Sequence, residues 1–428
     1  IVIGIGFRRY PFRQKLIFIV MAVSIISIVV VVLVSINSVE ESIQNTASQA
    51  LLTASSQAIS SVEGFINSAI ITVETEAENA VYGNYLAMSA EERVADQAIN
   101  VDLGLFKLLS RRDYPTREAN IYLRFLRGVS LVDIEGEVLR DTEEILIGQS
   151  MINNVAFLQT VSGPGTYVSP IRHNSEGLPL IFVSSQVKAE DGSVLGILIM
   201  RYDGNLFQQM IADLNNSAGL GSYAMLVEDR YYVQLANGLH PELNFKTPLT
   251  LNQQVVAEIQ AQGIASNAIG TTLSSNQSEL ANNLNQAKVA WEDFTQAQQD
   301  ASTRLAELAQ NEAEQELLLI NEELKILQQN LAFTFPDPVT NKPYLAAYSG
   351  MNLVPWVMVY SQSKDYFLAP LQRQVQNIQL LALVAALVAA GFAYVLSQFL
   401  AAPIGSLTRV ARSIAAGDFT LKAPVEAD

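Results

Sequence analysis

The sequence of 428 residues contains no cysteine and only two histidines, His173 and His240. The absence of cysteine excludes disulfides and thiolate chemistry, and two histidines are too few for the common zinc sites. The chain also lacks a glycine-rich phosphate-binding loop and the Gly-x-Ser-x-Gly signature of serine hydrolases. We therefore expect no metal, no cofactor and no enzymatic activity in this chain.

Positive charge is scarce, with 26 basic residues against 42 acidic ones and a net charge of -16. The charge is also sorted by position, because 39 of the 42 acids lie between residues 37 and 377 while the two ends together are basic. Nucleic-acid binding needs lysine and arginine gathered on one face, so the acidic middle argues against it.

Two runs have no charge at all, "LIFIVMAVSIISIVVVVLVSI" at residues 16–36 and a second at residues 378–400. At about 1.5 Å per residue, either run is long enough for a hydrocarbon core of roughly 30 Å. Basic residues precede the first run and follow the second, which predicts that residues 1–15 and the C-terminus are cytoplasmic. Residues 37–377 then lie outside the cytoplasm, and the lipid bilayer is a partner.

The hydrophobic pattern of residues 37–377 changes from helical to β-type along the chain. Apolar residues recur at helical spacing from Val39 to Tyr85, and β patterns with Glu-Gly and Asp-Gly turns follow in "VSLVDIEGEVLRD" and "LPLIFVSSQVKAEDGSVLGILIMRYD". Similar pairs of runs start at Ser222 and at Lys342. We predict an α+β fold with two tandem modules, at about residues 86–210 and 211–370.

The second module carries an insertion at about residues 255–331, rich in alanine, glutamine, glutamate and leucine. Its apolar residues form two helical series that are out of phase with each other. They are Trp291, Phe294, Ala301 and Leu305, and then Leu317, Ile320, Leu324, Leu327 and Leu331. The insertion is either a protruding coiled arm that contacts a partner or an amphipathic hairpin folded onto its own module. We favour the hairpin because such stripes are more often buried locally.

The stretch after the second apolar run predicts a new amphipathic helix with Pro403 in its first turn and its end at Gly417. Its apolar positions are Leu407, Val410 and Ile414. The phrases "PIGSL" and "SIAAGDF" resemble the first helix and connector of a HAMP domain, so residues 401–428 are expected to be the first half of that module. An amphipathic helix lying on the lipid surface is the alternative.

With this ending, the outer region resembles a double Cache sensor, through the order of its elements and the phrases "VSLVDIEGEV", "VLGILI" and "PWVMVYSQSKDYFLAP". The resemblance implies tandem PAS-like modules on a long N-terminal helix, with the module at 86–210 distal to the membrane and the other proximal. It also implies a homodimeric two-pass receptor of the bacterial cytoplasmic membrane that senses a small molecule. The resemblance further implies an output domain outside this chain, which would be that of a chemoreceptor, a histidine kinase or a nucleotide cyclase. The alternative function is a two-span envelope protein that organises polysaccharide through a coiled outer arm.

The ligand expectation rests on departures from the family's amine-binding pattern of Arg-x-Trp-Tyr, a later Tyr and an Asp. This chain has "NNVAFLQ", Ile171 and Arg201 at those places, with Asp203 displaced by two residues. Arg201 and Arg172, with Tyr167 and Phe157 as a wall, would suit a carboxylate or another anion. The alternative is that Arg201 pairs with Asp203 or a neighbouring carboxylate and only holds its strand.

The HAMP-like helix generates a first prediction. A lone helix of this length cannot bury its apolar stripe by itself, so we expect a parallel dimer. Leu407→Cys and Val410→Cys, each introduced singly into this cysteine-free chain, should form disulfide-linked dimers in membranes. Failure of crosslinking at every position of the stripe would contradict the dimer.

Overall fold

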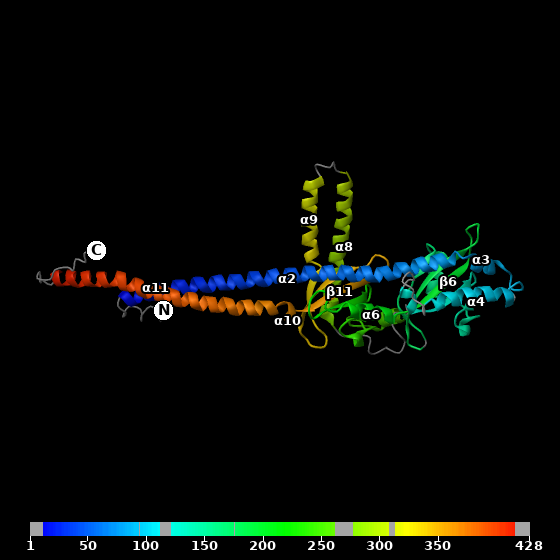
Figure 1. Ribbon diagram of the computed structural model, residues 1–428, viewed down its shortest axis with the longest axis horizontal. Helices are drawn as coiled ribbons and strands as arrows, with labels where there is room; N and C mark the ends of the chain where they lie inside the picture. Colours follow the sequence, from blue (N-terminus) through cyan, green and yellow to red (C-terminus); the bar gives the residue numbers. More distant parts are fainter. Residues whose placement is uncertain are drawn as a thin grey trace. The chain divides into compact units, whose positions relative to one another are not determined.

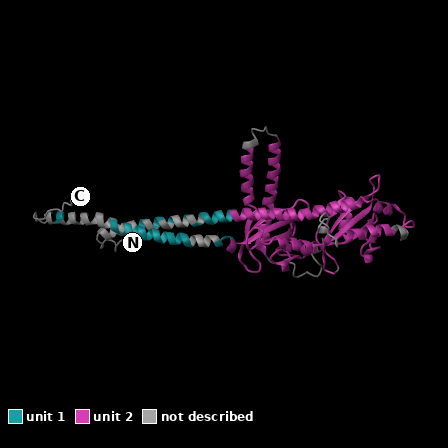
Figure 2. Ribbon diagram, in the orientation of Figure 1, with its two compact units in different colours: residues 1–45, 367–428 teal, residues 46–366 magenta. Residues whose placement is uncertain are grey.

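The chain divides into two compact units, coloured separately in Figure 2. The computed structural model describes residues 12–93, 95–111, 121–174, 176–261, 277–307 and 313–415. The first unit comprises residues 1–45 and 367–428 and contains the start of helix α2 (Phe12–Ala77) and helix α11 (Ala369–Ala415). The second unit, Thr46–Tyr366, contains both β-sheets.

The two apolar runs belong to α2 and α11. Many side chains of residues 16–36, and several of residues 378–400, lie outside the described part of the structure. Among the residues that are described, no helix is both long enough and apolar enough to cross a membrane.

Helix α11 corrects one local prediction. We expected Pro403 to open a new helix, but α11 continues through this position as far as Ala415. A proline removes one backbone hydrogen bond, and the alanines at positions 401 and 402 are strong helix formers that favour continuation. Val410 is half-buried, whereas the side chains of Pro403, Leu407 and Ile414, and Gly417 as a whole, lie outside the described residues.

Within the second unit, α2 contacts both sheets along one apolar stripe with steps of three and four residues. The stripe consists of Leu51, Ala54, Ala58, Val62, Phe65, Ile66, Ala69 and Val73, all buried. The Ser55 hydroxyl donates to the carbonyl of Met358 in the second sheet at 3.2 Å. The Phe65 ring lies edge-on to Tyr202 of the first sheet, with centroids 5.4 Å apart.

The first sheet is antiparallel, with strands in the order β2-β1-β6-β5-β3, and β4 also pairs with β5. The strands are β1 (Leu126–Asp133), β2 (Val138–Asp141), β3 (Thr166–Val168), β4 (Arg172–His173), β5 (Pro179–Lys188) and β6 (Val194–Asp203). Gly136 and Gly192, with φ of 85° and 86°, occupy the two predicted turns, β1–β2 and β5–β6. Three helices accompany this sheet: α3 (Ala80–Ala87), α4 (Ala95–Ser110) and α5 (Val155–Ser162). Two 3-10 turns, Ile121–Phe125 and Glu144–Leu146, flank strands β1 and β2.

The second sheet repeats this topology, with strands in the order β8-β7-β11-β10-β9. Its strands are β7 (Ser222–Glu228), β8 (Gln234–Asn237), β9 (Ala332–Pro336), β10 (Pro343–Gly350) and β11 (Trp356–Ser363). Helix α6 (Asn205–Asp213) leads into it from β6, the 3-10 turn Pro241–Leu243 follows β8, and α10 (Lys364–Phe367) follows β11. The internal repeat is thus visible in the strand order.

The insertion has features of both interpretations. Helix α7 (Gln253–Ala261) is followed by α8 (Ser278–Glu307) and α9 (Ala313–Gln329), which form a hairpin projecting from the second sheet (Figure 1). The base of α8 belongs to the core of its own module, because Leu280, Leu284 and Ala287 are buried against the sheet. On α9, in contrast, Leu318, Leu319 and Ile326 are 67%, 62% and 63% exposed.

This division of the hairpin predicts different effects for two leucines. Leu284→Ala should lower the free energy of unfolding by about 2–5 kcal/mol, because it opens a cavity at the base of α8. Leu318→Ala, the same truncation on an exposed face of α9, should change it by less than about 0.5 kcal/mol. Urea unfolding of the full chain measures both, and equal effects would contradict the described packing of α8.

Candidate functional site

Four of the five predicted ligand residues share one face of the first sheet, and the fifth, Phe157, lies on a helix that packs on this face. In the strand register Tyr167 pairs with Ser184, and Ser184 pairs with Ile199 of β6. Arg172 pairs with Leu180, which pairs with Asp203, and Arg201 lies between Ile199 and Asp203 on the same strand. Since side chains alternate along a strand, Tyr167, Arg172, Arg201 and Asp203 share a face. Helix α5 covers this face, and we call it the α5 face.

Helix α5 provides the apolar part of the site. Phe157 is buried in a cluster with four strand residues of the α5 face, Val132, Val138, Ile197 and Ile199. The side chain of Asn154 begins the helix by accepting a hydrogen bond from the Ala156 amide at 2.9 Å. The Thr160 and Ser184 hydroxyls, 2.6 Å apart, then tie α5 to β5. Phe157 therefore packs on the α5 face as part of its apolar cluster.

Arg201 is engaged within the protein. Its side chain is 4% exposed, and its two terminal nitrogens donate to both carboxylate oxygens of Asp141, at 2.7 Å each. It also donates to the hydroxyl of Ser130. Gly128 lies opposite on β1, where any Cβ would collide with the guanidinium. Arg201 therefore pairs with a neighbouring carboxylate, that of Asp141, which was the alternative to a ligand contact.

Asp203 is also engaged. One of its carboxylate oxygens accepts from Arg127, and the other accepts from the Asn205 amide at 2.9 Å, at the start of α6. This carboxylate therefore links the end of β6 to the first turn of the next helix. Its hydrogen bonds leave it poorly placed to hold a ligand.

Arg172 differs from these two residues. It is half-buried, and burial lowers the pKa of its guanidinium, an effect that Tyr167 partly offsets. Its Nε atom is buried without a hydrogen-bond partner, and no carboxylate of the described residues forms an ion pair with it. Arginine nevertheless stays protonated. Arg172 therefore offers a cation on the α5 face.

Tyr167 lies on the same face as Arg172. Burial raises the pKa of its hydroxyl, and the charge of Arg172 lowers it in part. The hydroxyl therefore stays protonated at neutral pH and can donate a hydrogen bond. A guanidinium and a phenol on one face both carry hydrogen-bond donors, which is chemistry that suits a small anion.

The equivalent face of the second sheet is filled by protein. Tyr223, Met225 and Val227 of β7 pack there with Leu280 and Leu284 of α8. Farther along α8, the ring of Trp291 lies against Gly350, so that a Cβ at this glycine would overlap the indole. The second module consequently has an apolar core where the first has the α5 face.

Sequence reasoning missed three residues: Asp141, which neutralises Arg201; Arg127, which neutralises Asp203; and Ser130, whose hydroxyl accepts a hydrogen bond from Arg201. Asp141 ends the first predicted hairpin, but its register opposite β1 places it beside Arg201, and this register is a tertiary property. The glycine at position 128, inside an otherwise bulky strand, was the available signal.

The histidines have structural partners. His173 lies edge-on to Phe245 with centroids 4.2 Å apart, and burial lowers its pKa, which favours the neutral ring. His240 has Glu242 at 3.1 Å from Nδ1 and Asp337 at 2.9 Å from Nε2. Over the described ranges, no group of three or more histidines and carboxylates is arranged to hold a metal ion.

Comparisons with known proteins give structural neighbours only, because no family model and no curated protein matches the chain. The sensor domain of the Vibrio cholerae histidine kinase DctB has 11% identity and a TM-score of 0.48, over 74% of this chain and 98% of that one. The sensory domain of the Campylobacter jejuni chemoreceptor Tlp3 has 12% identity and a TM-score of 0.43, over 78% and 98%. The ligand-binding domain of the Pseudomonas aeruginosa chemoreceptor PctC, in complex with GABA, has 11% identity and a TM-score of 0.41, over 74% and 99%.

The buried pair of Arg201 and Asp141 predicts a large effect on stability. Asp141→Asn should lower the free energy of unfolding by about 3–5 kcal/mol, because it leaves the Arg201 charge buried without its counter-ion. The matched control is Asp102→Asn, which removes a 38% exposed carboxylate that lies 3.8 Å from Arg140 and should cost less than about 1 kcal/mol. Thermal unfolding of the two variants measures both effects. A mild effect of Asp141→Asn would contradict the inferred role of Asp141 as the counter-ion of Arg201.

Proposed function

We propose that this chain is the input part of a transmembrane receptor that senses a small anion outside the cytoplasm. The observation that carries the proposal is Arg172, a half-buried guanidinium on the α5 face without a carboxylate partner in the described part of the chain. Uncompensated buried charge is costly, so a ligand that supplies the opposite charge gains a strong hydrogen-bonded contact.

The α5 face determines which residues contact the anion. Tyr167 donates through its hydroxyl and Phe157 forms the wall, while Arg201 and Asp203 shape the site through their own internal partners. A planar carboxylate fits the fork of Arg172, and a second carboxylate on the ligand would reach the phenol. An amine would meet the arginine charge and be repelled. Dicarboxylates are therefore the ligand class that we favour.

The route of the signal is the second part of the proposal. The charge-free runs at 16–36 and 378–400, with basic residues on their outer flanks, support two membrane spans with both termini in the cytoplasm. The receptor would then lie in the bacterial cytoplasmic membrane. Residues 401–428 form the first half of a HAMP module in a homodimer and pass the signal through Leu407, Val410 and Ile414 to an output domain. The ligand acts by binding one arrangement of the helices more tightly than the other.

The α8–α9 hairpin favours a second candidate, an envelope protein that organises partners through an outer arm. Its exposed residues Leu318, Leu319 and Ile326 are the specific observation, because exposed apolar side chains on a projecting helix suit a protein contact. This function needs no small-molecule site, so ligand binding at Arg172 distinguishes the two candidates.

Isothermal titration of the full chain tests the anion site, with succinate as the dicarboxylate and putrescine as the diamine. Succinate should bind, and Arg172→Gln should weaken its binding by about tenfold or more, because a charged hydrogen bond contributes roughly 1.5–3 kcal/mol. The matched control is Arg230→Gln, which removes a 62% exposed arginine of the second module and should leave the affinity unchanged. Binding of putrescine instead of succinate, with no effect of Arg172→Gln, would overturn the proposal.

A further inference from the structure

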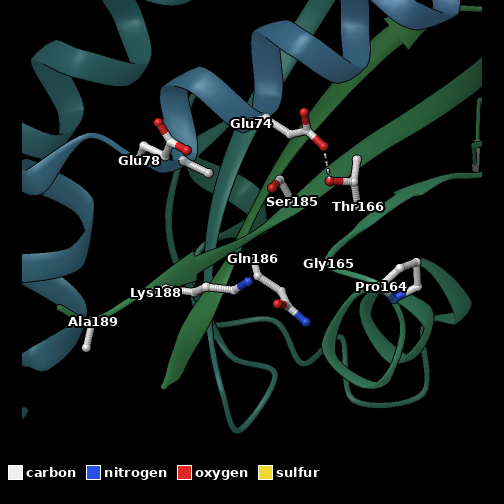
Figure 3. Close-up of a pocket in the computed structure, with 10 residues that line it drawn as sticks. Glu74, Glu78, Pro164, Gly165, Thr166, Ser185, Gln186, Lys188 and Ala189 are labelled. Atoms are coloured by element: carbon white, nitrogen blue, oxygen red, sulfur yellow. Dashed lines mark hydrogen bonds between the residues drawn. The ribbon is translucent and has the colours of Figure 1, made fainter. Parts of the chain in front are cut away.

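A pocket of about 450 Å³ lies outside the α5 face, where the end of α2 meets β3 and β5 (Figure 3). Thr166 pairs with Ser185 in the strand register, one step from the pair of Tyr167 and Ser184, so these two hydroxyl residues belong to the opposite face of the sheet. The pocket shares no lining residue with Arg172, Tyr167 or Phe157. It is lined by Glu74, Ala77, Glu78, Pro164, Gly165, Thr166, Ser185, Gln186, Lys188 and Ala189.

One wall of the pocket is negatively charged, and the fold leaves part of this charge without a basic partner within the described part of the structure. Glu74 and Glu76 lie in the last turn of α2, and Glu78 follows directly after the helix. The C-terminus of a helix carries a partial negative charge, so acidic side chains are unfavourable there. Arg111 compensates Glu76 at 3.0 Å, but Glu74 only accepts a hydrogen bond from the Thr166 hydroxyl at 2.6 Å. The Glu78 carboxylate has no side-chain or backbone partner among the described residues.

The other wall carries a positive charge. Lys188, at the end of β5, is exposed and forms no ion pair with any carboxylate in the described part of the chain. Next to it, the side-chain amide of Gln186 is fixed, because its nitrogen donates to the carbonyl of Thr160 at 2.8 Å. Gly165, with φ of 112°, forms the rim close to this amide, where a side chain would be strained.

Charges of opposite sign therefore line one cavity without pairing across it. Figure 3 displays Glu74 on α2, Glu78 just after the end of this helix, and Lys188 on strand β5. We propose that this pocket is a second ligand site, which binds a small zwitterion with its ammonium at Glu74 and Glu78 and its carboxylate at Lys188. A bare metal cation would have the lysine charge against it, and an anion would have the two glutamates against it. A molecule that carries both charges, separated by a few bonds, complements both walls.

Titration calorimetry on the full chain tests this site with zwitterions of increasing charge separation: glycine, 4-aminobutanoate and 6-aminohexanoate. At least one should bind, and Glu74→Gln and Lys188→Gln should each weaken its binding by about tenfold, the effect of one lost charged contact. Glu74→Gln keeps an acceptor for the Thr166 hydroxyl, so the helix end should remain folded. The matched control, Lys107→Gln, removes an exposed lysine of α4 outside the pocket and should leave the binding unchanged.

The Arg172→Gln variant separates this proposal from the proposed function. Zwitterion binding should persist in Arg172→Gln, whereas succinate binding should persist in Lys188→Gln, because the two sites share no residue. Failure of all three zwitterions to bind at about 10 mM would overturn the second site. Binding that is lost in Arg172→Gln and unchanged in both pocket variants would also overturn it, because the ligand would then occupy the α5 face.

Discussion

The buried stripe of α2 is the constraint on which the second unit depends. Its small and β-branched residues, among them Ala54, Ala58 and Val62, let two sheets approach a single helix. Ser55 contacts the second sheet and Phe65 contacts the first, so the spacing of the modules is fixed by distance along one helix. Because α2 packs against both sheets, it is the structural element that the two modules share.

The two modules show how one strand order supports different uses. On the first sheet, the face covered by the short helix α5 keeps arginines and carboxylates next to an apolar floor. On the second sheet, α8 lays its leucines and Trp291 over the corresponding strands, and that face becomes core. The insertion therefore both forms the projecting hairpin and covers the face that corresponds to the α5 face. Internal symmetry of topology does not imply symmetry of chemistry.

Ion pairing decides which charges of the α5 face are neutralised within the fold. Arg201 and Asp203 look like ligand residues by type, yet Asp141 and Arg127 neutralise them inside the fold. Paired charges of this kind hold strands and a helix start in place. They have little hydrogen-bonding capacity left for a ligand, because their hydrogen bonds are already formed within the protein. Arg172 stands on the two-residue strand β4, where the described neighbours provide no carboxylate, and so its charge has no counter-ion within the described part of the chain.

The sequence by itself determined the order of the elements, because alternation, helical spacing and Asp-Gly or Glu-Gly turns are local signals. It indicated the β5–β6 hairpin, the internal repeat and the helical insertion. It also selected Tyr167, Arg172, Arg201 and Asp203, which the register brings onto one face, and Phe157 of the helix that packs there. Only the tertiary structure decided which of these charges are paired, since Asp141 reaches Arg201 through strand register across 60 residues of chain. The same holds for the pocket at Glu74 and Lys188, because the end of a helix and the edge of a sheet become neighbours only when the chain packs.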